Sequence, residues 1–422
     1  MHGRLVETAG RGVRIRRLGG DRAGEIRLTR FLRNEAVTIE AMVDAAAART
    51  AERCVGRRVL AIQDTTVIRS EGGGGLYLHP VLAVDADDGS ILGLTYACFL
   101  KRTGGKKGSR RSKAVKDKQS QRWLDGAART MEVCVGAARV TVVADRESDI
   151  YDAFAERPQG CDLLVRAAHD RALQDGGHLF ETVDALPVGG RAELDLPAKV
   201  GRKARTAQMA IRFMSASLAR PCNGVAAGRP KSVAMTVVDV REVDTPEGET
   251  PVHWRLLTTH AVADTAEALA IADLYRRRWN IEQLFRTMKT KGFDIEGALI
   301  EEEAPLTRLA MATLIAAITV QQLVHARDGL QGPNPLRPMT DAFEAEDQPL
   351  LEAFTAKLEG KTQPQKNPHP KGSLAYGAWV CARLGGWNGY YGKPGPIVML
   401  NGWLHFQQAK HGVAVMAAHH DV

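Results

Sequence analysis

Two short apolar segments of this chain each end at an aspartate. Arg58 to Gln63 has the composition of a buried strand and is followed by Asp64, and Val140 to Ala144 is a second such strand, followed by Asp145. Apolar runs of this length favour strands that are covered on both faces. Two strands that end in aspartate predict an α/β fold in which both acids lie at one catalytic edge.

The rest of the chain alternates between helical and strand patterns. A change to short β-like runs, broken by Gly, Pro and Asn, begins at Cys161 and predicts an inserted β region up to Thr259. The expected helices are Thr38 to Glu52, Gln121 to Cys134, Asp149 to Glu156, Asp264 to Lys289 (capped by Asp264 and Glu267, with a break near Trp279 left open) and Leu306 to Arg327. The other expected strands are Leu76 to Val84 and Ile91 to Leu100, joined at Asp88-Gly89, then Arg191 to Leu196, Ala207 to Met214, Ser232 to Val240 and His253 to Thr258.

Four polar residues share one face of the helix expected before Lys289. Tyr275, Arg278, Glu282 and Lys289 are spaced 3, 4 and 7 residues apart. On one continuous helix this spacing places all four within an arc of about 60°. A buried face does not favour a phenol, two cations and a carboxylate together, so the pattern suits a site that holds phosphate beside a metal.

The acids Asp64, Asp145 and Glu282 form an all-oxygen set of candidate ligands. Hard divalent ions such as Mg²⁺ and Mn²⁺ prefer such ligands. Two of these ions about 3.5–4 Å apart activate an attacking hydroxyl and stabilise the leaving oxygen in phosphoryl transfer. The alternative is that each strand-end aspartate only caps a turn, which is natural for Asp64 because Thr65 and Thr66 follow it.

The charge of the chain favours a polyanionic partner. The 422 residues carry a net charge of +8, with a pI near 9.2. Residues 1–33 hold nine arginines against three acids and show no clear period, which predicts a flexible or DNA-touching arm. Residues 101–118 hold nine Lys or Arg and one acid, which predicts an exposed basic loop that contacts DNA or is merely solvated.

The six cysteines and the apolar runs indicate an intracellular protein without a membrane anchor. The cysteines include no CxxC pair, so neither a zinc ribbon nor a disulfide framework is expected. No signal-peptide pattern is seen, and the longest apolar run, Leu309 to Val320, is too short to cross a bilayer. We expect a cytoplasmic, nucleoid-associated protein with reduced thiols.

The Tyr-x2-Arg-x3-Glu-x6-Lys pattern at Tyr275 to Lys289 resembles the signature of the IS-four family of DDE transposases. The segment Ala61-Ile-Gln-Asp-Thr-Thr is similar to the first-aspartate strand of that family, and Ala144-Asp-Arg-Glu-Ser-Asp-Ile resembles its second-aspartate segment. Further matching segments are 30–34, 254–258 and 382–386, so the resemblance covers roughly residues 25–410.

The resemblance implies an RNase H-like mixed-sheet core, interrupted by a β-rich insertion and followed by a C-terminal helical region. In this layout the expected domains are an Arg-rich N-terminal arm and helix (1–55), the first part of the core (56–158), the insertion (159–259), the second part of the core (260–330) and a C-terminal helical dimerisation region (331–422). It further implies a homodimer on DNA, which nicks transposon ends, passes through a hairpin and joins 3′ ends to target DNA.

The resemblance also assigns roles to individual residues. Asp64, Asp145 and Glu282 would bind two Mg²⁺ ions, for which Mn²⁺ would substitute. The cations Arg278 and Lys289, together with Tyr275, would grip phosphates near the transposon end. Trp254 would stack on a base flipped out of the duplex, against the alternative of a tryptophan buried in the insertion.

One departure from the family pattern leaves a second function open. Members carry an N-terminal helical domain that recognises transposon ends, and only about 30 poorly patterned residues precede the 30–34 segment here. A non-transposing DNA-binding protein that dimerises with a full-length relative and inhibits it is therefore the alternative hypothesis. A housekeeping RNase H-like nuclease would have no use for Trp254 or the C-terminal region.

Overall fold

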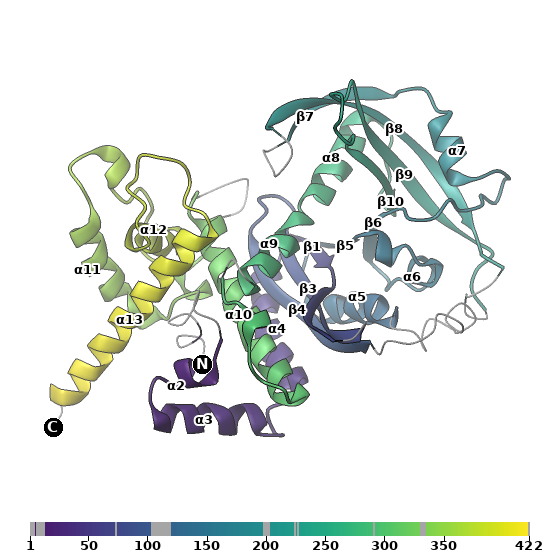
Figure 1. Ribbon diagram of the computed structural model, residues 1–422. Helices are drawn as coiled ribbons and strands as arrows, with labels where there is room; N and C mark the ends of the chain where they lie inside the picture. Colours follow the sequence, from purple (N-terminus) through teal and green to yellow (C-terminus); the bar gives the residue numbers. More distant parts are fainter. Residues whose placement is uncertain are drawn as a thin grey trace.

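The computed structural model describes residue 5 and residues 13–71, 74–102, 120–196, 203–222, 225, 228–289, 292–329 and 335–420. The protein is built on one ten-stranded mixed sheet with helices on both faces, and a helical region follows at the C-terminal end (Figure 1). This is the α/β architecture expected from the sequence, and it is consistent with an RNase H-like transposase core. Residues 103–118 of the basic loop predicted at 101–118 lie outside the described residues.

The sheet has a parallel centre, with antiparallel strands on both sides. The order is β2-β3-β1-β5-β6-β10-β9-β8-β7, and β4 pairs with β3 at the side. The β1–β5 and β5–β6 pairs are parallel, and the other pairs are antiparallel. The strands are β1 (Arg58–Gln63), β2 (Thr66–Glu71), β3 (Gly74–Asp85), β4 (Ile91–Arg102), β5 (Arg139–Ala144), β6 (Cys161–Arg166), β7 (Gly190–Leu196), β8 (Arg205–Ala219), β9 (Ser232–Val243) and β10 (His253–Thr258).

The helices cover the sheet in two layers. One core layer packs the sheet against α8, α9, α10 and the C-terminal helices, and the other packs it against α5, α6 and α7. The helices are α2 (Ile15–Gly19), α3 (Arg22–Arg33), α4 (Ile39–Cys54), α5 (Gln121–Val133), α6 (Tyr151–Ala155), α7 (Leu179–Asp184), α8 (Thr265–Arg276), α9 (Trp279–Met288), α10 (Glu303–Ala326), α11 (Gln348–Leu358), α12 (Leu374–Leu384) and α13 (Pro396–His420). A short 3₁₀ helix, η3 (Arg146–Ser148), follows β5.

The predicted strands around the two aspartates are confirmed. β1 and β5 are neighbours, and they run parallel from the Arg58–Arg139 pair to the Ile62–Val143 pair. The expected hairpin of β3 and β4 and the four strands expected in the inserted region also form. These inserted strands are not a separate sheet, because β10 pairs with β6 and so continues the sheet that carries the aspartates.

Of the two alternatives for the N-terminal arm, flexible or DNA-touching, the flexible one is wrong for the described part, because Ile15–Gly19 forms α2 and Arg22–Arg33 forms α3. Asp21 caps α3 by accepting a hydrogen bond from the Gly24 N–H at 2.6 Å. The buried Arg308 on α10 donates to the carbonyl of Leu32 at 2.7 Å and so anchors the end of α3. Sequence patterning missed α3 because one buried leucine, Leu32, and a single charged anchor hold it, rather than a wide apolar stripe.

Helix α10 is the central support of the molecule. The apolar run from Leu309 was expected to be too short to cross a bilayer, but α10 is 24 residues long and apolar enough to do so. However, 72% of its most apolar window is buried inside the protein. It is therefore a core helix, which contacts α3, α4, α9, α12 and α13.

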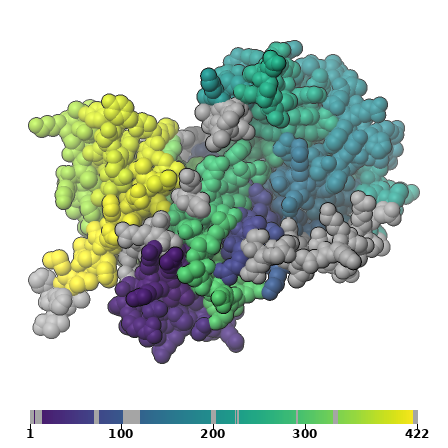
Figure 2. All heavy atoms as spheres, viewed as in Figure 1, coloured from purple at the N-terminus to yellow at the C-terminus, as the bar shows by residue number. Residues whose placement is uncertain are grey.

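The C-terminal helices α12 and α13 approach each other at two glycines. A Cβ atom on Gly402 would lie 1.6 Å from the Cys381 carbonyl oxygen, and one on Gly385 would lie 2.0 Å from the Val398 carbonyl oxygen. The two backbones therefore pack closer than any larger residue allows. Figure 2 shows this region on one side of the molecule, with the inserted strands on the other side and the N-terminal helices beneath.

This packing predicts opposite effects of the same substitution at two positions of α13. Gly402→Ala should lower the free energy of unfolding by about 1–3 kcal/mol or more, because the helices must separate. Gly412→Ala, with nothing within 4 Å of its new methyl group, should be neutral or stabilising, since alanine favours a helix. Urea unfolding of both variants checks this, and an equal midpoint shift for the two would contradict it.

Candidate active site

The parallel pairing of β1 and β5 brings Asp64 and Asp145 to one edge of the sheet. If the register at Ile62 and Val143 continues, it sets the two aspartates side by side, with their strands about 4.8 Å apart. Alternation of side chains gives Asp64 the face of Ile62 and gives Asp145 the face of Val143. Both of these apolar residues belong to the core layer under α9 and α10, so both acids face those helices.

Arg278 links the first aspartate to Glu282. Its guanidinium donates to Asp64 Oδ2 at 3.1 Å and forms a second ion pair with Glu282 one turn along α9. All three side chains are largely buried. Burial opposes a charge on Arg278, but its pKa is raised by Tyr275, Glu282, Asp64 and Asp145. All three acids that are expected to bind metal therefore raise the pKa of one guanidinium, that of Arg278.

Asp64 lies in an environment that disfavours its charge. Burial raises the pKa of Asp64 to about 6, and the nearby Asp145 and Glu282 add to this shift. The N–H of Thr65, 2.7 Å from Asp64 Oδ1, and the charge of Arg278 act in the opposite direction. Like charges gathered in a partly desolvated site need cations to stay ionised.

The break near Trp279 that the sequence left open is confirmed, because α8 ends at Arg276 and α9 begins at Trp279. The expectation that all four residues lie on one continuous helix is therefore wrong. Hydrogen bonds from residue i to i−3 tighten the chain here, including Arg278 N–H to the Tyr275 carbonyl at 3.0 Å. Arg277 donates to the carbonyls of Asp85 and Asp87 in the β3–β4 turn, at 2.9 and 3.0 Å. Lys289 lies just past the end of α9.

Tyr275, Trp254 and Lys289 border the acids. Tyr275 is buried, and its ring lies edge-on to Trp254 with 6.0 Å between ring centroids. Trp254 is half-buried on β10. Lys289 forms an ion pair with Glu296 at 2.8 Å. Burial raises the pKa of the Tyr275 phenol, so the hydroxyl stays protonated beside Arg278.

Two residues near the site were missed by the sequence analysis. Arg166 ends β6, is half-buried, lies beside the Tyr275 phenol, and donates a hydrogen bond to the His253 carbonyl at 2.7 Å. Trp279 follows Arg278 and is 51% exposed, which is unusual for an indole. Arg166 gave no sequence signal, because its neighbours come from a strand and a helix far along the chain.

The oxygen donors of the three acids fit a hard divalent cation chemically. In the part of the chain that the structure describes, no three His, Cys, Asp or Glu side chains are arranged as a ready metal cluster. Instead, the guanidinium of Arg278 supplies the positive charge between Asp64 and Glu282. A metal ion held by Asp64 and Glu282 would have to displace Arg278 from them.

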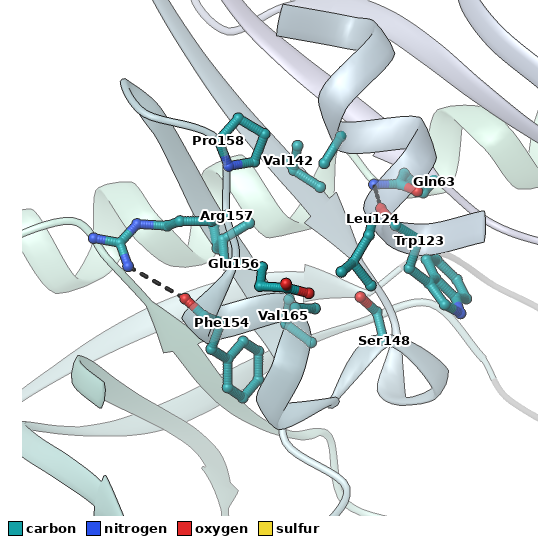
Figure 3. Close-up of a pocket in the computed structure, with 13 residues that line it drawn as sticks. Gln63, Trp123, Leu124, Val142, Ser148, Phe154, Glu156, Arg157, Pro158 and Val165 are labelled. Carbon is teal, nitrogen blue, oxygen red and sulfur yellow. Dashed lines mark hydrogen bonds between the residues drawn. The ribbon is translucent and has the colours of Figure 1, made fainter. Parts of the chain in front are cut away.

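The cavity on the opposite face of the sheet is a packing defect. It lies between α5, α6 and the strands, and Gln63, Trp123, Val142 and Phe154 are among its lining residues (Figure 3). Its volume is about 20 Å³, room for roughly one water molecule. It does not reach the face on which the acids lie and is too small for a substrate.

The mixed sheet with its C-terminal helical region defines an α/β protein, and this architecture is consistent with an RNase H-like transposase core. The chain belongs to the transposase DDE domain family, whose sequence profile matches residues 77–318. The match includes Asp145 and Glu282 and begins after Asp64. Membership confirms the expected DNA transposition, with DNA bound, cleaved and joined by strand transfer, and DDE transposases generally use divalent metal ions.

Asp149, four residues after Asp145, has a structural role. Its buried carboxylate accepts two hydrogen bonds from the Arg171 guanidinium, at 2.8 and 2.5 Å, and two from the N–H groups of Ala168 and His169, at 2.7 and 2.9 Å. Asp145 is half-exposed, and its side chain accepts one hydrogen bond from the Glu147 N–H at 2.9 Å. Asp149 is therefore held in a buried hydrogen-bond network, whereas the Asp145 carboxylate is not.

Asparagine substitutions should separate these roles. Asp149→Asn leaves the Arg171 charge buried without its partner and should lower the free energy of unfolding by about 3–5 kcal/mol. Asp145→Asn keeps the acceptor of a single turn bond and should lower it by about 1 kcal/mol or less. Urea unfolding measures both, and equal losses of stability would show that the assignment of Asp149 is wrong.

Proposed function

We propose that this protein is a DNA transposase of the IS-four type, which cuts transposon ends and joins their 3′ ends to target DNA with Asp64, Asp145 and Glu282 as its catalytic carboxylates. One observation carries the proposal: the buried guanidinium of Arg278 forms ion pairs with Asp64 and Glu282, and the nearby Asp145 helps to raise its pKa. Acids remote in sequence do not gather in a desolvated site without a cationic ligand to bind.

The three carboxylates would hold two Mg²⁺ ions, with Mn²⁺ as the natural substitute. When bound, the pair of ions activates the attacking hydroxyl and stabilises the leaving oxygen of the scissile phosphodiester. The protein orients the acids through its backbone. The N–H of Thr65 fixes Asp64, and the N–H of Glu147 fixes Asp145.

The cations of the pattern would exchange carboxylate partners for DNA phosphates. Arg278, released from Asp64 and Glu282, can fork two phosphate oxygens, and Lys289, released from Glu296, supplies a point charge. Tyr275 lies beside Arg278, with 6.0 Å between the guanidinium carbon and the centre of the phenol ring. Both cations are then placed to bind the phosphates next to the scissile bond.

The hairpin step and the dimer extend this proposal. Trp254 lies against Tyr275, close enough to the site to stack on a base flipped out of the DNA once the Tyr275 contact opens. Helix α13 exposes Val413, Val415 and Met416 near the C-terminal end, an apolar surface that suits pairing with a second copy on DNA. Arg-rich α3 lies beside α10 and offers further phosphate contacts.

Replacing Glu282 tests the proposed chemistry. Glu282→Gln should reduce Mg²⁺-dependent cleavage of end-bearing DNA by more than about a hundredfold, because a metal ligand is lost, while DNA binding changes little. Asp273→Asn, which removes an exposed carboxylate from α8, is the matched control and should cleave like the parent. Gel-based cleavage and filter binding measure the two quantities.

Two results would contradict this prediction. Unchanged cleavage by Glu282→Gln would remove that residue from the chemistry. A parent protein that binds DNA and blocks a full-length relative, yet never cuts in Mg²⁺ or Mn²⁺, would support the alternative of a non-transposing inhibitor.

Salt dependence tests the phosphate-binding cations. Arg278→Ala and Lys289→Ala should each weaken binding of transposon ends and lower the slope of log affinity against log salt by about one, because each removes one phosphate contact. Arg139→Ala is the control, since Arg139 begins β5 at the opposite edge of the sheet and pairs with Asp162. Binding isotherms between 50 and 200 mM salt, roughly the range in which such contacts are lost, give the slopes. Parallel slopes for all four proteins would refute the assignment.

A further inference from the structure

We propose that Arg122 is a positioning residue that sets the separation of Asp64 and Asp145 by bridging Thr65 and Glu147. This inference rests on the proposed function, because it concerns how the two aspartates are held for metal. Arg122 lies at the start of α5, on a different element from either aspartate. Its role would be to join the two loops that carry them.

The bridge connects residues that each hold one aspartate. Arg122 Nε donates to Thr65 Oγ1 at 3.2 Å, and its Nη2 donates to Glu147 Oε2 at 2.9 Å. The backbone N–H of Thr65 donates to Asp64 Oδ1 at 2.7 Å, and that of Glu147 donates to Asp145 Oδ1 at 2.9 Å. One planar guanidinium therefore connects the two amides that orient the catalytic carboxylates.

A buried histidine holds the other side of Thr65. His79 is fully buried on β3, with Nδ1 2.9 Å from Thr65 Oγ1 and Nε2 3.1 Å from Gln63 Oε1. These contacts assign the proton of the imidazole to Nε2, which donates to Gln63 Oε1. The Thr65 hydroxyl then donates to Nδ1 and accepts a hydrogen bond from Arg122. The Thr65 hydroxyl is thus held from two directions, which restrains the residue whose backbone N–H donates to Asp64.

Stability alone does not account for an arginine at this position. The side chain is 5% exposed, and its guanidinium lies 4.9 Å from the centre of the Trp123 ring, whereas its partner Glu147 is 57% exposed, so that ion pair is of the weak surface type. A cation in the first turn of a helix is also disfavoured by the helix dipole. Burial of the Arg122 charge therefore costs free energy, which is expected where a charged side chain fixes the positions of other groups rather than stabilising the fold.

The experiment removes each end of the bridge without emptying the core. Glu147→Ala and Thr65→Val are compared with Glu132→Ala, which removes an exposed acid from the Arg129 ion pair at the far end of α5. The two readouts are Mn²⁺ affinity without DNA, by calorimetry, and the single-turnover cleavage rate at saturating end DNA. Outer contacts of metal ligands typically contribute 10–100-fold, so both bridge variants should lose about tenfold in each readout.

The expected pattern distinguishes positioning from a merely structural role. DNA affinity without metal should stay near that of the parent for both variants, as should the urea midpoint of Glu147→Ala, and Glu132→Ala should match the parent throughout. Thr65→Val also removes the hydroxyl that His79 Nδ1 and Arg122 Nε bind, so its urea midpoint should fall. In an Arg122→Gln background that folds, Glu147→Ala should have no further effect, because the bridge is already gone. Arg122→Lys should recover less than half of the Mn²⁺ affinity that Arg122→Gln loses, since the single ammonium of lysine cannot reach both Thr65 and Glu147.

Several outcomes would overturn the inference. It fails if Glu147→Ala and Thr65→Val both bind Mn²⁺ and cleave within twofold of the parent, or if the losses of Glu147→Ala follow lowered stability instead. Glu282→Gln in the same assays separates the two proposals. If that variant is inactive while the bridge variants are unaffected, the positioning role alone is wrong; if it cleaves normally, the proposed function is wrong.

Discussion

The site depends on the parallel pairing of β1 and β5. This pairing ends both strands at an aspartate on the same edge and face of the sheet, and every other feature of the site follows from two carboxylates placed together. Carboxylates so close, and partly desolvated, repel one another unless a cation balances them. In the protein without DNA, Arg278 is the cation that balances these carboxylates. Burial nevertheless raises the pKa of Asp64 to about 6.

The scaffold brings the third acid to this edge by interrupting a helix. The break between α8 and α9 is held by Arg277, which binds two carbonyls of the β3–β4 turn. It lets α8 follow the inserted strands, while α9 turns Arg278 and Glu282 toward Asp64. The insertion shares the sheet with the core through β6 and β10, so Trp254 and Arg166 lie at the same site.

The sequence predicted the elements well where apolar periodicity decides them. β1 forms over the predicted residues, and α4, α5, α10 and the hairpin of β3 and β4 agree closely, because buried strands and wide apolar helix faces leave clear patterns. Family membership confirmed the DDE transposase prediction, while the IS-four assignment and the individual site roles stay predictions. The pattern at Tyr275 was informative although the helix is broken within it.

What the sequence did not predict depends on contacts between remote residues. Helix α3 is held by Arg308, 271 residues or more away along the chain, and the bridge of Arg122 joins segments on three different elements. The helix break depends on Arg277 reaching a turn in another part of the sheet. Local propensity carries none of this information, because the energy lies in tertiary hydrogen bonds.

The most direct test of the account is the position of bound Mn²⁺ in crystals of the protein with cleaved end DNA, located by anomalous scattering. The account predicts two manganese peaks about 3.5–4 Å apart, coordinated by Asp64, Asp145 and Glu282, with Arg278 turned onto a phosphate. Manganese bound elsewhere, or Arg278 still paired with Asp64 and Glu282 on DNA, would contradict it.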